Sequence, residues 1–228
     1  MPLLRYSLVI ALLLSCSLSA FSQNKKAFFQ LGVSANSYKG DLQESYDKLS
    51  SGFHFGVRVH GDKRVNGGLL FHAGSLTGQN VRFVSADPSI TPNSFFKTRL
   101  LSGQFNLNIN IIKKDNFRLF ISQGIGLLNF QPENDLGEQL LDLPDTRSFG
   151  ESYTNNALIL PTALGVLYTL KNGFGLALRF TYLNPQTDYL DNISTLGPDD
   201  NNDRVFQTNL TLLVPFNLPS PKSAKSSE

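Results

Sequence analysis

The chain is poor in several residue types on which enzymes and soluble domains rely. Its 228 residues include one cysteine, three histidines and no tryptophan, and only 17% of them are charged. A single cysteine excludes an internal disulfide and a multi-cysteine metal site. Typical soluble domains carry about 25% charged residues, so ionic groups are scarce here. The net charge of +2 provides no basic patch, which argues against nucleic acid as a partner.

Long hydrophobic runs are missing as well. No segment approaches the roughly 18 consecutive apolar residues that a membrane-spanning helix needs. The apolar run from Leu8 to Leu14 follows the positive Arg5 and precedes Ala20-Phe21-Ser22, which fits a small-x-small cleavage site. Residues 1–22 are therefore predicted to be a cleaved export signal. The alternative is lipoprotein processing at Cys16.

Alternation of apolar and polar residues with period two dominates the rest of the chain, which predicts β-strands. In the cleanest segment Leu101, Gly103, Phe105, Leu107 and Ile109 face one way, and Ser102, Gln104, Asn106, Asn108 and Asn110 face the other. The other expected strands cover 29–36, 53–60, 67–77, 117–129, 157–169, 174–183 and 205–216. Most runs are close to the 9–11 residues that a tilted strand needs to cross a bilayer. Pro161 weakens the sixth, because proline cannot donate to the ladder.

The links between these segments alternate in length. Short polar turns are expected at 61–66, 113–116 and 171–173, and long links at 38–51, 78–96, 131–156 and 184–204. Short periplasmic turns and long extracellular loops are typical of outer-membrane barrels. We therefore predict an all-β fold: a single closed antiparallel transmembrane β-barrel of about eight strands over residues 23–216, followed by a disordered polar tail at 217–228.

The alternation alone does not say which face looks outward, and a soluble lipocalin-like barrel would show the same rhythm. The polar face carries amides, hydroxyls and glycines, whereas a soluble exterior would carry many Lys and Glu. We therefore expect the polar face to line a narrow, side-chain-filled lumen and the apolar face to meet lipid. The aromatic residues expected to form girdles at the two membrane interfaces are Phe28, Phe53, Phe95, Phe96, Phe117, Tyr168, Phe174, Tyr182, Phe206 and Phe216.

A polar cluster is predicted inside the lumen. If the turn centres near Lys63, antiparallel pairing places His54 opposite His72, both pointing inward. Arg58 lies further along the same face of its strand. Arg118 and Arg179 also point inward by the alternation. A metal site needs three or four ligands, so we expect hydrogen-bonded packing here, with no cofactor, metal or catalytic group.

Carboxylates gather in the last long link. They are Asp188, Asp191, Asp199, Asp200 and Asp203, and Asp41 lies close to them if the first and last long links share one rim. Oxygen ligands of this kind bind Ca²⁺, but the spacing matches no regular calcium loop. The favoured interpretation is a solvated loop in which Asp, Asn and Gly supply turns.

Two segments carry a family resemblance. The first is Tyr38-Lys39-Gly40-Asp41-Leu42, and the second runs from Thr187 through Asp188, Tyr189, Leu190, Asp191, Asn192 and Ile193 to Ser194, followed by Asn202-Asp203. Together they resemble a family of small outer-membrane barrels from Bacteroidota, in which Asp and Val are usual where this chain has Asn192 and Ile193. One branch of that family is an accessory component of type IX secretion, and most members have no assigned activity.

The resemblance implies a non-enzymatic protein of the bacterial outer membrane. Its expected partners are the lipid bilayer and proteins of the periplasm or outer membrane, within an assembly such as the type IX secretion machinery. The alternative is a lipid-modifying or ligand-binding barrel with a site at the lumen mouth. Such an enzyme needs a serine within hydrogen-bond reach of a histidine, and a third group to orient them.

Overall fold

The structure is a computed structural model that describes residues 26–59, 63–85, 87, 89, 93–140, 155–197 and 201–217. The predicted export signal with Cys16 and the tail beyond Asn217 lie outside the described residues, as do His60, Asp199 and Asp200. No helix within the described ranges is long and apolar enough to cross a membrane.

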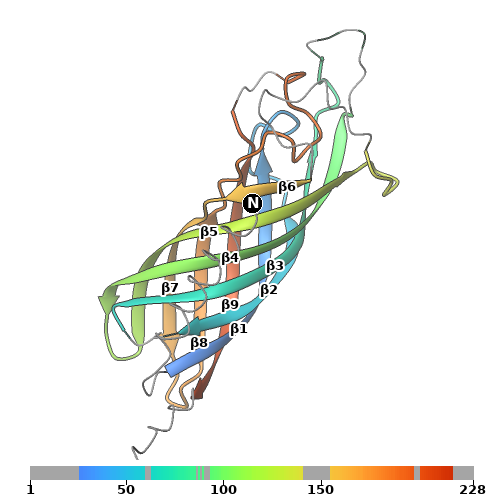
Figure 1. Ribbon diagram of the computed structural model, residues 1–228. Coiled ribbons are helices and arrows are strands. Elements are labelled where there is room, and N and C mark those ends of the chain that lie inside the picture. Colours follow the sequence, from blue (N-terminus) through green and yellow to red (C-terminus); the bar gives the residue numbers. More distant parts are fainter. Residues whose placement is uncertain are drawn as a thin grey trace, which may run out of the picture.

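The described residues form one closed antiparallel barrel (Figure 1). The strands are β1 (Lys26–Lys39), β2 (Ser50–Val59), β3 (Val65–Gln79), β4 (Phe95–Lys113), β5 (Phe117–Glu133), β6 (Asn156–Ile159), β7 (Thr162–Thr169), β8 (Gly175–Tyr182) and β9 (Arg204–Asn217). They follow the order β4-β3-β2-β1-β9-β8-β7-β5, and the pairing of β4 with β5 closes the ring. Closure leaves no free sheet edge, which is what a sheet in hydrocarbon requires because no water can satisfy its backbone groups.

The short strands β6 and β7 together take the place of one strand of the wall, so the barrel has the predicted eight strand positions. Both pair with β5, through Gly126 opposite Ile159 and Gln123 opposite Thr162. Pro161 separates them, as expected for a residue without an N–H. The Gly124 amide donates to the Pro161 carbonyl at 2.7 Å, so hydrogen bonding continues past the break.

Long and short links lie at opposite ends of the barrel. The four long links are 40–49, 80–94, 134–155 and 183–203, and the three short ones are 60–64, 114–116 and 170–174. Lys26 pairs with Asn217, so the first and last strands begin and end together at the short-turn end. The predicted alternation of link lengths is confirmed.

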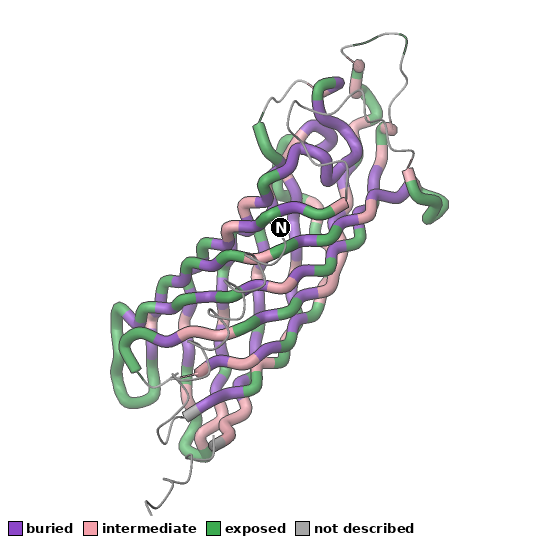
Figure 2. The backbone as a smooth tube through the Cα atoms, in the orientation of Figure 1, coloured by how far each residue is buried: buried purple, intermediate pink, exposed green. Residues whose placement is uncertain are grey.

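Buried and exposed residues alternate along every long strand (Figure 2). On β4, Phe105 and Leu107 are 49% and 44% exposed, whereas Asn106 and Asn108 are only 5% and 3% exposed. A soluble barrel would show the opposite pattern, because its oily residues would fill the interior. The apolar face therefore looks outward and the polar face lines the lumen.

The interior has three layers. Near the short turns lies a small apolar cluster of Phe28, Phe120, Leu167, Ala177 and Leu213. The middle layer is polar and includes His54, Arg58, Asn66, His72, Gln104, Asn106, Asn108, Arg179, Asn209 and Thr211. Under the long links lies a larger apolar cluster of Tyr38, Leu42, Leu76, Phe96, Leu100, Leu128, Phe130, Ala157, Ile159, Leu183, Tyr189, Leu190, Ile193, Leu196 and Val205. Side chains thus pack both ends of the lumen.

Two of the expected girdle residues are placed wrongly by the sequence argument. Phe28 is 4% exposed and belongs to the apolar cluster near the short turns. Phe96 is 0% exposed and belongs to the apolar cluster under the long links. Both sit on the inward parity of their strands, and an aromatic ring there fills the barrel end instead of meeting lipid. Tyr168 and Phe117 are 50% and 38% exposed and remain on the outer wall.

Candidate functional site: an acidic cap over a polar lumen

The first and last long links meet at one rim of the barrel and bury a group of acids. We call Asp41, Asp188, Asp191 and Asp203, together with Tyr38, the acidic cap. All five are at most 5% exposed. The Tyr38 hydroxyl lies 2.7 Å from Asp191 Oδ2 and 2.5 Å from Asp203 Oδ1. Residues more than 150 positions apart in the sequence therefore share one hydrogen-bonded centre.

Backbone amides also bind these carboxyl groups. Asp191 accepts from the amides of Leu42 at 3.2 Å and Ile193 at 2.9 Å, and Asp203 accepts from the Leu190 amide at 2.6 Å. The Leu42 bond ties the first link to the last, and the other two bonds hold the last link in its folded shape. The carboxyl groups thus fasten the cap to the barrel rim.

Counting protons assigns an extra proton to this centre. A tyrosine hydroxyl has a single hydrogen to donate, yet it lies within hydrogen-bond distance of two carboxyl oxygens. It can donate to one carboxylate and accept from the other group only if that other group is protonated. One carboxyl of the pair is therefore neutral in the closed cap.

The electrostatic surroundings favour the same protonation. Burial raises the pKa of Asp191 to about 7, although hydrogen bonds to Tyr38 and the backbone oppose the rise. Burial also raises the pKa of Asp203 well above its usual range, and the charges of Asp191 and Asp188 raise it further. Desolvation disfavours the ionised form of both acids.

The expectation of a solvated acidic loop is wrong for the part that the structure describes. Asp188, Asp191 and Asp203 are buried because apolar neighbours of the last link, including Leu190 and Ile193, pack into the barrel mouth and carry the acids with them. The calcium alternative gains no support either, since within the described residues no three His, Cys, Asp or Glu side chains are arranged so that they could hold a metal ion.

Local backbone geometry explains why small or flexible residues occupy the family motifs. Asn192 has φ of 69°, a left-handed conformation that Asn and Asp tolerate better than other non-glycine residues. A Cβ on Gly40 would lie 2.0 Å from the Tyr38 hydroxyl oxygen. The motif glycine therefore leaves room for the hydroxyl that joins the two acids.

Gly197 offers a test of the cap packing. A Cβ there would lie 2.1–2.2 Å from all three carboxyl atoms of Asp41, whose short buried side chain has little freedom to move. We expect Gly197→Ala to destabilise the cap by about 1–3 kcal/mol, the usual cost of overpacking. Limited proteolysis of the last link measures this. Gly103→Ala on the outer wall is the control, and equal resistance of both variants would argue against tight packing around Asp41.

Inside the lumen, the predicted register of the histidines is confirmed. His54 is directly opposite His72, and both are buried. His54 Nε2 is 2.8 Å from the Thr211 hydroxyl and His72 Nε2 is 2.9 Å from the Ser34 hydroxyl. The two rings are therefore held by hydroxyl groups within the packed lumen.

The inward direction predicted for the arginines is also confirmed. Arg58, Arg118 and Arg179 are 3%, 8% and 8% exposed. Arg58 donates from Nε to Asn66 Oδ1 at 2.6 Å, and its guanidinium carbon lies 4.7 Å from the centre of the Phe120 ring. An amide and an aromatic face thus hold this cation.

The hydrogen bond between Ser34 and His72 was not predicted from the sequence. Alternation puts Ser34 on the inward face of β1, but Ser34 pairs directly with Gly52 and reaches His72 across β2. The glycine leaves the gap that this contact crosses, since a Cβ at Gly52 would lie 2.5 Å from the Ser34 hydroxyl. An inward glycine between two polar strands was the signal available.

A closed barrel with eight strand positions, an apolar exterior and a packed polar lumen is typical of outer-membrane proteins. A family model described as the outer membrane protein beta-barrel domain matches residues 8–212. The chain belongs to this family. The outer-membrane barrel therefore sits in the lipid bilayer of the outer membrane, and the acidic cap lies on the extracellular side, where such barrels carry their long loops.

Several solved structures resemble the outer-membrane barrel at low identity. Ail of Yersinia pestis, solved with the heparin analogue sucrose octasulfate, is 12% identical, with 85% of this chain and 100% of that chain covered and a TM-score of 0.49. Neisserial surface protein A is 11% identical, with 83% and 97% covered and a TM-score of 0.48. The outer membrane enzyme PagL is 13% identical, with 82% and 99% covered and a TM-score of 0.38. A search of curated proteins finds no match.

Proposed function

We propose that the outer-membrane barrel is a non-enzymatic accessory component of an outer-membrane assembly. The packed lumen supports this role. Apolar clusters fill the barrel beneath the long links and beside the short turns. A barrel of eight strands has an interior that side chains fill. A barrel without an aqueous path works through its surfaces, which are the lipid-facing wall, the extracellular cap and the periplasmic turns.

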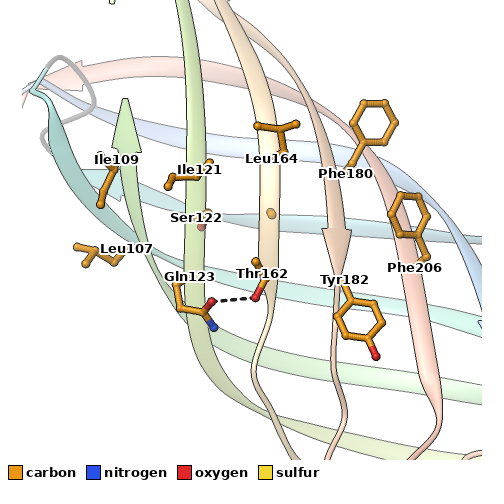
Figure 3. A pocket seen from close by; sticks show the side chains of 11 residues that line it. Leu107, Ile109, Ile121, Ser122, Gln123, Thr162, Leu164, Phe180, Tyr182 and Phe206 are labelled. Atoms are coloured by element: carbon orange, nitrogen blue, oxygen red, sulfur yellow. Dashed lines mark hydrogen bonds between the residues drawn. The ribbon is translucent and has the colours of Figure 1, made fainter. Parts of the chain in front are cut away.

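A groove on the lipid-facing wall carries the proposal. It lies beside the break between β6 and β7 and encloses about 570 Å³. Figure 3 shows Gln123 and Thr162 within it, joined by a hydrogen bond of 2.8 Å between Thr162 Oγ1 and Gln123 Oε1. Apolar side chains surround the pair; they include Leu107, Ile109, Ile121, Leu164, Phe180 and Phe206.

Polar groups on a wall that faces hydrocarbon favour a protein neighbour over lipid. Both Gln123 and Thr162 are exposed, and acyl chains offer them no hydrogen-bond partner. Among the described residues, the Gln123 amide nitrogen donates only to the carbonyl of the next residue, Gly124, at 3.3 Å. Transmembrane segments commonly associate through amide and hydroxyl side chains of this kind. We therefore assign the groove to a transmembrane element of another outer-membrane protein.

The type IX secretion machinery is the narrower proposal. Its support is the motif similarity, and the motif residues Tyr38, Gly40, Asp41, Asp188, Tyr189 and Asp191 come together in the acidic cap or directly beside it. Deleting the gene that encodes this protein should then reduce secretion of type IX cargo, and restoring the gene should recover secretion. Normal cargo secretion in the deletion strain would remove this narrower role.

Co-purification tests the broader proposal. Tagged protein is isolated from native membranes in mild detergent, either wild type or with Gln123→Leu and Thr162→Val together. Making the wall apolar should leave the barrel folded while a stoichiometric partner is lost. Leu69→Ala, in a second outer groove lined mainly by apolar side chains, is the matched control and should retain the partner. Unchanged recovery with the double variant would exclude the groove as the contact.

The hydrogen bond between Ser34 and His72 favours a second candidate, an acyl-modifying enzyme, because a serine next to a histidine base is the core of such sites. Against it, the two residues are 7% and 5% exposed inside the lumen, away from lipid substrates. Ser34→Ala discriminates: a structural role lowers the unfolding temperature without changing the lipid profile of the membrane, whereas an enzymatic role changes that profile.

A further inference from the structure

Positive and negative charges are separated along the barrel axis. Among the described strand residues, Glu133 is the single acid, and it forms an ion pair with Arg99 near the long-link end of β5. The other carboxylates that are buried in the described part of the chain belong to the acidic cap. Arg58 and Arg179 are buried further down, and the described part of the lumen offers them no carboxylate.

The contacts of Arg58 leave part of its guanidinium unmatched. Nε donates to Asn66, and the group lies over the ring of Phe120. Nη2 is fully buried and meets no acceptor within the described residues. An amide oxygen and an aromatic face carry only partial negative charge, so neither neutralises the cation.

Arg179 brings a second positive charge to the same region. It lies within electrostatic range of Arg58, His54 and His72, and Arg118 is also in range of Arg58. The Arg58 guanidinium, with its unmatched Nη2, and the Arg179 guanidinium come from β2 and β8 and share one region of the lumen.

Burying like charges together is costly unless an opposite charge joins them. The surrounding wall and bilayer have a low dielectric, in which removing ions from water costs several kcal/mol for each ion. Lumen water can satisfy single hydrogen bonds, but it leaves the net charge in place. We propose that the lumen binds a small inorganic anion of the halide class between Arg58 and Arg179.

The packing of the lumen limits the size of this anion. Inward side chains pack the interior between the two apolar clusters, so we expect a monatomic ion here and not a bulky organic anion. The site acts as a structural counter-ion site, and its occupation is independent of any partner that binds the wall or the cap.

Anomalous diffraction from crystals grown in sodium bromide tests the inference directly. We expect a bromide peak within hydrogen-bond distance of Arg58 Nη2 and of the Arg179 guanidinium. Bromide peaks confined to the protein surface, with none in the lumen of the same crystals, would overturn the proposal. This measurement needs no variant, so it holds even if substituted barrels fail to fold.

Thermal unfolding in detergent gives a second readout. At matched ionic strength, replacing sodium gluconate with sodium bromide should raise the unfolding temperature of the wild-type barrel, because an ion that binds only the folded state stabilises it. Arg179→Gln should lose most of that rise, whereas Arg64→Gln, an exposed residue next to a short turn, should retain it. The same rise in both variants would exclude a lumen site.

Discussion

Placing an arginine at Leu107 should destabilise the folded barrel by about 2–4 kcal/mol, the cost of a charged residue on the lipid face near the bilayer midplane. Leu107 is 44% exposed on the outer wall and lies six residues before Lys113, where β4 ends at a short turn. At about 3.4 Å per residue and a tilt of about 40°, this places it about 16 Å into the membrane. Denaturant titration in lipid vesicles measures the change.

Leu49→Arg is the matched control for this prediction. Leu49 is 70% exposed in the first long link, outside the wall of the barrel, so the same substitution should cost less than about 0.5 kcal/mol. Equal destabilisation at both positions would mean that charge itself, and not its location in hydrocarbon, is responsible. No destabilisation at Leu107 would place that side chain in water.

Removing the hydroxyl of Tyr38 should loosen the extracellular cap by about 2–4 kcal/mol. Tyr38→Phe keeps the ring, which packs edge-on against Phe96, but takes a hydrogen-bond partner from both Asp191 and Asp203. A buried polar group that loses its partner costs about 1–3 kcal/mol, and here two groups lose it. Hydrogen exchange at the Leu42, Leu190 and Ile193 amides, which the acids bind, measures the effect.

The same centre makes the cap of the wild-type protein sensitive to pH. Asp191 and Asp203 have raised pKa values when the cap is closed, so the closed cap holds protons that the open cap releases. Its stability is complete below the ordinary carboxyl pKa of about 4 and is lost as pH rises through about 7 for Asp191 and through the raised pKa of Asp203. Exchange corrected for its intrinsic pH dependence should therefore accelerate above neutral pH.

Asp203→Asn separates this effect from general loosening. The amide is neutral at every pH, can accept from the Leu190 amide and can donate to Tyr38, so it should weaken the pH dependence while keeping the cap closed. Exchange that accelerates with pH as steeply in this variant as in the wild type would show that the shared proton is not the cause.

The eight strand positions could be predicted from the sequence because a sheet between lipid and a polar lumen requires strict alternation of apolar and polar residues. The register of His54 against His72 followed from a single short turn, since a hairpin fixes its own pairing. Even the interruption at Pro161 was visible, because the missing amide hydrogen forces a local break. The same alternation places Phe28 and Phe96 on the inward face, but their aromatic character was given more weight than their position in the strand.

The acidic cap could not be predicted in the same way. Its central contact joins Tyr38 to Asp191 and Asp203, and no local pattern encodes which long links fold over the barrel mouth. Five aspartates in a link rich in Asn look solvated, and the burial of Asp188, Asp191 and Asp203 depends on Leu190 and Ile193 packing into the rim. The pairing of two resembling motifs, one in each link, was the only available sign that these segments act together.

The orientation of the wall supports the fold, the groove and the enclosed lumen alike, and labelling from within the bilayer tests it most directly. The unmodified barrel is reconstituted with lipids that carry a photoactivated carbene precursor at the end of the acyl chain, and labelled residues are mapped by mass spectrometry. We expect label on Phe105 and Leu107 and none on Asn106 and Asn108. Label on the two asparagines, with the two apolar side chains left unmodified, would contradict the account.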